Sequence, residues 1–80
     1  MQNIQTISLN KCDRNIFYVI EFVECKNIPI SRRLIELGFV KGAELKIIQF
    51  SALKKTLLVE ISGYILSLRA NVASFIKVKK

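Results

Sequence analysis

Residues 27–42 read NIPISRRLIELGFVKG, and this stretch decides the fold. Its first part repeats with the period of a helix, because Ile30, Leu34 and Leu37 follow one another at intervals of four and three and form one apolar stripe. The stripe predicts a helix over about residues 28–37. Since a helix of about two and a half turns is not stable alone, we expect it to dock on other elements.

Both ends of this helix carry local signals. Asn27 is suited to cap the first turn, where Pro29 also fits because its missing N–H would have no partner there. Gly38 is expected to end the helix in the left-handed conformation, which strains other residues. Gly42 suits a type II turn position that requires positive φ. A helix, a stop and a turn are therefore predicted in direct succession.

Segments with the period of strands flank the helix on both sides. Residues 16–24 alternate, with one face formed by Ile16, Tyr18, Ile20 and Phe22. On the other face, Phe17, Val19 and Val23 either form an exposed docking surface or lie beneath the helix. Further strands are predicted over residues 44–50, 56–61, 64–69 and 76–78, with these side chains inward: Leu45, Ile47, Leu57, Val59, Ile61, Leu66, Leu68.

The connections complete the predicted architecture. Ser62 and Gly63 form a two-residue hairpin turn. The remaining segments are predicted to be a short strand at 4–9, a polar turn at 11–15, a loop at 51–55 and a helical turn at 71–74 capped by Asn71. The fold class is therefore mainly β: a small, partly open barrel of five to six strands, with one short helix and one helical turn.

Length and composition restrict the function. The 80 residues suffice for one domain, predicted to span residues 1–80, and 51% of them are hydrophobic, which excludes disorder. No stretch reaches the roughly 18 consecutive apolar residues of a membrane span. Residues 1–10 lack the features of a signal peptide. We therefore expect a cytoplasmic protein without direct membrane insertion.

Residues that carry chemistry are scarce. The chain has no histidine, and its glycines are too dispersed for a phosphate loop. The acidic residues are all predicted to lie on the surface, without a close pair: Asp13, Glu21, Glu24, Glu36, Glu44 and Glu60. Cys12 and Cys25 are too few for a tetrahedral metal site and are interpreted as unpaired, Cys12 in a loop and Cys25 at a strand end. The sequence predicts no enzyme, no catalytic residue, no cofactor and no metal site.

The charge of the chain favours an acidic partner. Thirteen basic residues against six acidic ones give a net charge of +7. The basic residues are scattered along the chain rather than gathered in one segment. Scattered charge is typical of a solvated surface, so the charge alone does not define a binding site.

Residues 32–42 resemble the signature of the FeoA family (ferrous iron transport protein A), in which an arginine–leucine helix ends at a Leu-Gly pair and a second Gly follows four residues later. Residues 61–63, 66–69, 76–78 and Ala73 are similar to the closing part of that family, so the resemblance covers about residues 7–79. It implies an SH3-like barrel and a cytoplasmic accessory role in bacterial ferrous iron uptake. The implied partner is the membrane ferrous iron transporter B, bound through its cytosolic GTP-binding part, whose GTP-dependent activity the chain would modulate.

Two sets of residues follow from this interpretation. The structural signature comprises Leu34, Leu37, Gly38, Gly42, Gly63, Leu68 and Arg69. The candidates for partner binding are Arg32, Arg33, Lys54, Lys55, Phe17 and Val19. Local roles compete with partner binding, since Arg33 is spaced to pair with Glu36 and the two lysines would also solubilise a loop tip. The apolar face is compatible with a weak homo-oligomer.

Two alternatives remain at this point. A small basic barrel could bind nucleic acid, with Tyr18 and Tyr64 stacking on bases. This alternative is weaker, because no strand carries an aromatic pair flanked by arginines. The second alternative is a relative of the similar barrel that ends some metal-dependent repressors. It would require an attached pair of DNA-binding helices, for which 80 residues leave no room.

Overall fold

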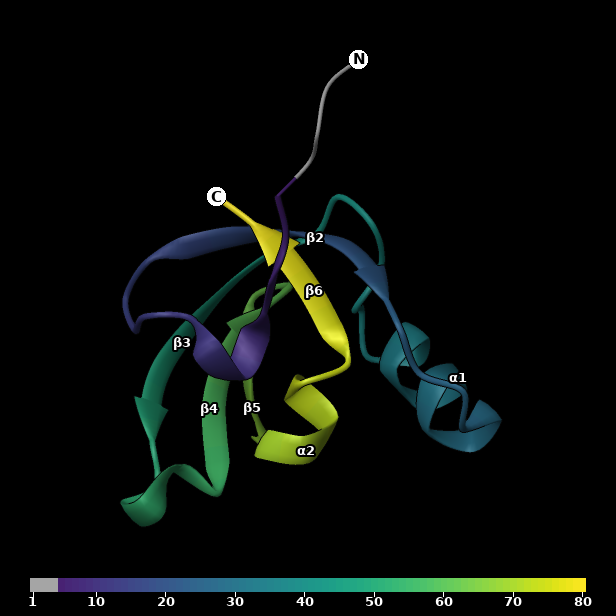
Figure 1. Ribbon diagram of the computed structural model, residues 1–80. Coiled ribbons are helices and arrows are strands. Elements are labelled where there is room, and N and C mark those ends of the chain that lie inside the picture. Colours follow the sequence, from purple (N-terminus) through teal and green to yellow (C-terminus); the bar gives the residue numbers. More distant parts are fainter. Residues whose placement is uncertain (1–4) are drawn as a thin grey trace.

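Six strands form one sheet that curls into a partly open barrel (Figure 1). The computed structural model describes residues 5–80. The strands are β1 (Ile7–Ser8), β2 (Phe17–Val23), β3 (Glu44–Phe50), β4 (Thr56–Ile61), β5 (Tyr64–Arg69) and β6 (Ile76–Lys79). They pair antiparallel in the order β1-β6-β2-β3-β4-β5, so β1 and β5 are the edges. The predicted mainly β class is confirmed.

Four helical segments join the strands. They are α1 (Ile28–Glu36), α2 (Ala70–Ala73) and the 3₁₀ helices η1 (Leu9–Lys11) and η2 (Ala52–Lys54). In Figure 1, α1 stands to one side of the barrel, whereas α2 lies between the ends of β5 and β6. None of the helices in the described part of the chain has the length and apolar character needed to cross a bilayer.

The strands after α1 match the prediction closely. The bounds of β3, β4 and β5 are those expected from the alternation of apolar residues. Ser62 and Gly63 have φ of 52° and 81°, the positive values that a type I′ turn requires at both central positions. The resulting core contains these buried side chains: Leu9, Cys12, Tyr18, Ile20, Leu34, Phe39, Leu45, Ile47, Leu57, Val59, Ile61, Leu68, Ala73, Ile76 and Val78.

Strand β2 departs from simple alternation. Tyr18 and Ile20 are buried as expected, but Phe22 is 47% exposed. The pairing of β2 with β6 shifts register between Ile20 and Phe22, which is the mark of a β-bulge. The bulge turns Glu21 inward, where its carboxylate lies 3.3 Å from Lys79 Nζ and the residue is 9% exposed. The predicted surface position of Glu21 was therefore wrong.

The prediction also erred at two element ends. The expected strand at 4–9 is only Ile7–Ser8, because Leu9 starts η1 and is buried; residues 1–4 lie outside the described part. Asn71 does not cap α2. That helix begins one residue earlier, with Arg69 as the capping residue and no side-chain hydrogen bond to the cap. The helix propensities of the residues did not predict this earlier start, because β5 ends at Arg69 and α2 begins at the next residue without a connecting turn.

Candidate functional site

A groove lies between α1 and the free edge of β5. It has a volume of about 350 Å³ and is lined by Ile30, Arg33, Leu34, Leu37, Leu66, Ser67, Leu68, Arg69 and Val72. Neighbouring residues of a strand point to opposite faces. A hollow that touches four consecutive residues of β5 therefore lies along the edge of this strand rather than over one face. We call this hollow the α1–β5 groove.

The helical wall of the groove is set by local sequence. Asn27 Oδ1 accepts a hydrogen bond from the Ile30 N–H at 3.1 Å, so Asn27 caps α1 as predicted. Within α1, Leu34 alone is buried, at 3% exposure. Ile30 and Leu37 are half-buried and pack against the edge of the core. The helix is thus attached to the barrel through few side chains, and part of its apolar stripe remains available.

The junction after α1 joins the helix to the start of β5. The Tyr64 hydroxyl donates a hydrogen bond to the Leu37 carbonyl. Gly38 follows with φ of +102°, and a Cβ there would lie 3.0 Å from Ser62 Oγ. Both the backbone conformation and the close approach therefore favour glycine. Phe39 is fully buried and donates its N–H to the Leu34 carbonyl at 2.9 Å.

Two arginines stand at the rim of the groove. Arg33 and Arg69 are both exposed. The ion pairs among the described residues are Lys46–Glu60, Lys77–Glu24 and Lys79–Glu21, so neither arginine is in one, and the local Arg33–Glu36 pair is not formed. Arg69 also lines a shallow hollow with Lys54 and Lys55. A basic band thus runs from Arg33 along the end of β5 to the η2 loop.

The structure brings together only part of the predicted partner-binding set. Arg33 lies in the groove, and Lys54 and Lys55 lie in the adjoining hollow. Phe17 is 56% exposed, so α1 does not cover it, and Lys46 Nζ lies 4.8 Å from the centre of its ring. It lines a separate hollow beside the Ser62–Gly63 turn, while Val19 is half-buried. Arg32 is exposed on α1 and does not line the groove.

Sequence reasoning missed several residues of the groove. Arg69 was assigned to the structural signature, yet it alternates with the buried Leu68 and therefore points outward, a signal that was present in the sequence. Ile30 and Leu66 were interpreted only as core residues, whereas both are partly accessible from the groove. Val72 had no assigned role. Nothing in a single sequence places Val72 beside α1.

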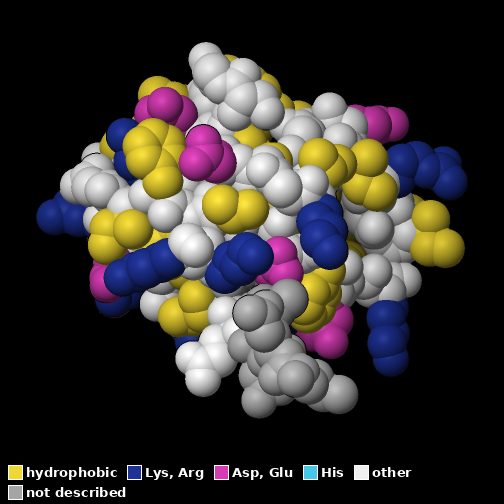
Figure 2. All heavy atoms as spheres, turned by 90° about the horizontal axis from the view of Figure 1, so that it is seen from above, with side chains coloured by type: hydrophobic (Ala, Val, Ile, Leu, Met, Phe, Trp, Pro, Cys, Tyr) yellow, Lys and Arg dark blue, Asp and Glu magenta, His cyan; other side chains and the backbone are white. Residues whose placement is uncertain are grey.

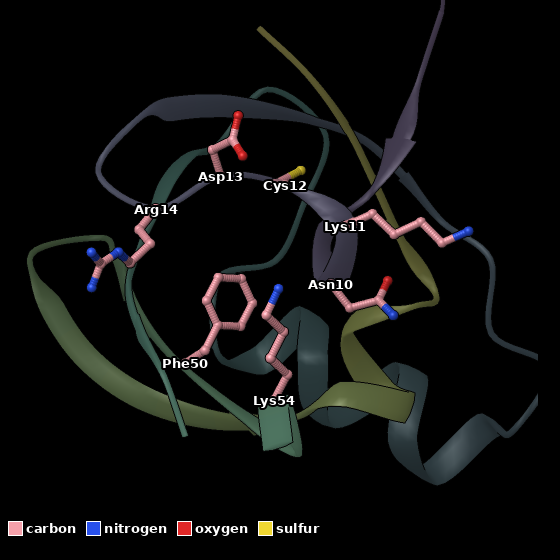
Figure 3. Close-up of a pocket in the computed structure, with 7 residues that line it drawn as sticks. All are labelled: Asn10, Lys11, Cys12, Asp13, Arg14, Phe50 and Lys54. Carbon is pink, nitrogen blue, oxygen red and sulfur yellow. The ribbon is translucent and has the colours of Figure 1, made fainter. Parts of the chain in front are cut away.

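A second hollow, of about 420 Å³, lies beside η1 (Figure 3). It is lined by Asn10, Lys11, Cys12, Asp13, Arg14, Phe50 and Lys54. Lys54 and Phe50 point into it, with Lys54 Nζ 5.3 Å from the ring centre, whereas Lys11 and Arg14 extend away from its middle. No group of three Cys, Asp or Glu side chains among residues 5–80 is placed to hold a metal ion. The divergent cations do not converge on one ligand position.

Cys12 in this region is a buried, protonated thiol. Its side chain hydrogen-bonds to the Ser8 carbonyl at 3.5 Å, and the residue is 5% exposed. Burial, which disfavours the thiolate, raises the pKa of Cys12 from 9.0 to about 11. Because the raised pKa favours the protonated form, its contribution to stability is complete below pH 9 and is lost as the pH rises through about 11.

The thiol is therefore expected to be unreactive in the folded chain. At pH 8, alkylation of Cys12 by iodoacetamide should be about 100-fold slower than in the urea-unfolded chain, since two pKa units lower the thiolate fraction by that factor. Mass spectrometry of tryptic peptides measures the rate. Cys25, which is half-buried, serves as the internal control and should react in the folded chain. Equal protection of both cysteines would contradict this assignment.

The aromatic residues do not support base stacking. Tyr18 is 4% exposed, and its hydroxyl accepts a hydrogen bond from the Asp13 N–H at 3.2 Å, so the prediction that it could stack on a base was wrong. The Tyr64 hydroxyl is bound to Leu37. On the face shown in Figure 2, Lys and Arg side chains are interspersed with acidic and hydrophobic ones and form no continuous stripe. These features weaken the nucleic-acid alternative.

Solved structures share this architecture. FeoA of Stenotrophomonas maltophilia, crystallised with zinc and described as a procaryotic SH3 domain protein, is 32% identical over 95% of this chain and 91% of that one, with a TM-score of 0.79. FeoA of Chlorobium tepidum is 30% identical over 91% of this chain and 69% of that one, with a TM-score of 0.81. These similarities confirm the predicted SH3-like fold.

A more distant likeness concerns the fold alone. A manganese-dependent transcriptional repressor is 15% identical, with a TM-score of 0.89 over 99% of this chain and 38% of that one. No curated protein sequence matches the chain significantly.

The strongest link is to one family. The model of the FeoA domain matches residues 7–80, which include α1, the groove and every strand of the sheet. This match confirms the resemblance first seen in residues 32–42. The chain belongs to the FeoA family of ferrous iron transport accessory proteins, whose domain is not an enzyme.

Proposed function

We propose that this chain is a cytoplasmic accessory protein of bacterial ferrous iron uptake that binds the cytosolic GTP-binding part of the membrane ferrous iron transporter. In this role it modulates the GTP-dependent activity of the transporter. The α1–β5 groove is the contact surface, and its two rim arginines engage carboxylates of the transporter.

The observation that carries the proposal is an apolar groove, in a member of the FeoA family, whose two arginines form no ion pair with any described residue. The rim arginines, Arg33 and Arg69, lie beside the half-buried side chains of Ile30 and Leu66. An apolar centre with a charged rim is the usual anatomy of a protein interface. A groove of about 350 Å³ suits a few inserted side chains rather than a large flat contact.

Direct binding tests this function. The purified cytosolic part of the transporter from the same cell is titrated with the chain in a calorimeter, with and without GTP. We expect a saturable one-to-one complex and a changed rate of GTP hydrolysis when the chain is in excess. A dissociation constant of about 100 μM is weak even for a transient complex. If no binding is detected at protein concentrations of about 100 μM, the proposal is refuted.

A further inference from the structure

The free edge of β5 carries main-chain groups that the barrel does not use. Strands β4 and β5 are joined by the two-residue turn Ser62–Gly63, and residues that flank such a turn form a hydrogen-bonded pair. The pair Ile61–Tyr64 is therefore hydrogen-bonded, and so is every second pair along the ladder. It follows that the N–H and C=O groups of Ile65 and Ser67 point away from β4.

Two hydrogen bonds beyond the ladder confirm this alternation. The Ala70 N–H donates to the Lys55 carbonyl at 2.8 Å. Lys55 and Ala70 are the next pair in the series of hydrogen-bonded pairs that starts at Ile61–Tyr64 and includes every second pair of the ladder. The Thr56 carbonyl accepts from the Ser51 N–H at 2.9 Å and thus faces away from β5. Among residues 5–80, no hydrogen bond outside the β4–β5 ladder uses the main chain of Ile65 or Ser67.

The edge also lacks the usual protection against pairing. Edge strands are commonly guarded by proline, by lysine or by a covering element. Strand β5 reads YILSLR, with neither proline nor lysine; its one charged residue, Arg69, stands at its last position, and Ile65 in its middle is 56% exposed. On this side the α1–β5 groove, which is also lined by Val72 of α2, separates β5 from α1. The edge is therefore open along the middle of β5.

The groove matches the side chains of an added strand. One set of alternating side chains would enter the hollow, whose apolar lining consists of Ile30, Leu34, Leu37, Leu66, Leu68 and Val72. A carboxylate on the same strand would meet Arg33 or Arg69 at the rim, since neither arginine has an acidic partner in the part of the chain that the structure describes. Within the described range 5–80, no acidic residue lines the groove, so the charge of its two arginines is uncompensated there.

We propose, building on the function above, that the transporter binds by adding an extended segment to β5 as a seventh strand. The segment hydrogen-bonds to the main chain of Ile65 and Ser67. Its alternate side chains are apolar and lie in the groove, and it carries an acidic residue that pairs with Arg33 or Arg69. In this binding mode the main-chain hydrogen bonds supply affinity, and the contacts of the alternate side chains supply specificity.

A second copy of this chain fits the edge less well. Two copies paired through β5 would each present Arg33 and Arg69, with no acidic residue of the described range 5–80 in the lining of either groove. The net charge of +7 adds repulsion between the copies. The occupant we assign is therefore an extended segment of the transporter that carries an acidic residue.

Hydrogen exchange measured by NMR tests the proposal without any substitution. The isotopically labelled chain is mixed with the unlabelled cytosolic part of the transporter, and amide exchange is followed residue by residue. We expect the amides of Ile65 and Ser67 to exchange at least about tenfold more slowly in the complex, as hydrogen-bonded amides do. A complex in which both amides exchange as fast as in the free chain would overturn the added strand and leave the transporter assignment intact.

A matched pair of variants gives a second test. Ser67→Pro removes the outward N–H together with the serine hydroxyl, and edge strands tolerate proline at such positions. It should weaken transporter binding at least about tenfold relative to Ser67→Ala, which also lacks the hydroxyl but keeps the N–H. Circular dichroism verifies the fold of both variants, and if Ser67→Pro does not fold, the exchange experiment decides.

The remaining outcomes are also decisive. Failure of the transporter part to bind at all would refute the proposed function together with the added strand. Slow exchange of Ile65 and Ser67 in the chain alone, at concentrations where light scattering finds a dimer, would show β5–β5 pairing and overturn the assigned occupant.

Discussion

Replacement of Phe39 by alanine is expected to destabilise the fold by about 3–5 kcal/mol. Phe39 is the largest fully buried side chain among residues 5–80 and lies between α1 and β3 in the chain. Its removal leaves a cavity at the point where the helix is attached to the barrel. Because domains of this size have a stability near the low end of about 5–15 kcal/mol, only about 0–2 kcal/mol would remain, and up to about half of the variant should be unfolded. Urea unfolding followed by circular dichroism measures the effect.

The neighbouring residue provides a matched control. Val40 is 44% exposed, so Val40→Ala removes apolar atoms without creating an internal cavity. We expect its effect to stay below about 1 kcal/mol. Equal midpoints for Phe39→Ala and the natural chain would show that Phe39 does not hold the junction of α1 and the barrel.

Reversal of both rim charges should abolish most of the binding to the transporter. The double variant Arg33→Glu, Arg69→Glu removes two cations from the groove and adds repulsion toward a carboxylate. We expect an affinity loss of about 100-fold, close to 3 kcal/mol, since a hydrogen bond to a charged group contributes about 1.5–3 kcal/mol. Calorimetric titration with the cytosolic part of the transporter measures it.

The control for this double variant must change the net charge of the chain by the same amount at residues outside the groove. Lys26 and Lys41 are exposed and lie in neither the groove nor an ion pair of the described residues. The double variant Lys26→Glu, Lys41→Glu therefore tests the long-range effect of charge alone, which salt screens over about 10 Å at 0.1 M. We expect a loss below about fivefold at that ionic strength. An equal loss in both double variants would mean that overall charge, and not the groove, governs binding.

The sequence predicted those parts of the fold that depend on neighbouring residues. The helix cap at Asn27, the helix end at Gly38 and the Ser62–Gly63 turn follow from local rules, and all three are observed. The inward position of Glu21 was not predictable in this way. It depends on a register shift against β6, a strand more than fifty residues away in the chain.

The α1–β5 groove could not be predicted from the sequence either, because it also depends on contacts between residues that are far apart in the chain. Its width depends on where α1 sits relative to β5, and the hydrogen bond between Tyr64 and Leu37 joins residues 27 positions apart. The residue types were visible in the sequence, and Arg33 was identified as a candidate. That Arg33 and Arg69 line the same groove was visible only in the three-dimensional structure.

The most direct test of the central claim is a map of the bound surface. NMR chemical-shift changes of the labelled chain are recorded while the cytosolic part of the transporter is added. We predict that the largest changes fall on α1, β5 and α2, around Arg33, Ser67 and Val72. Changes centred instead on Phe17 and Lys46, or on the hollow beside η1, would contradict the assignment of the α1–β5 groove.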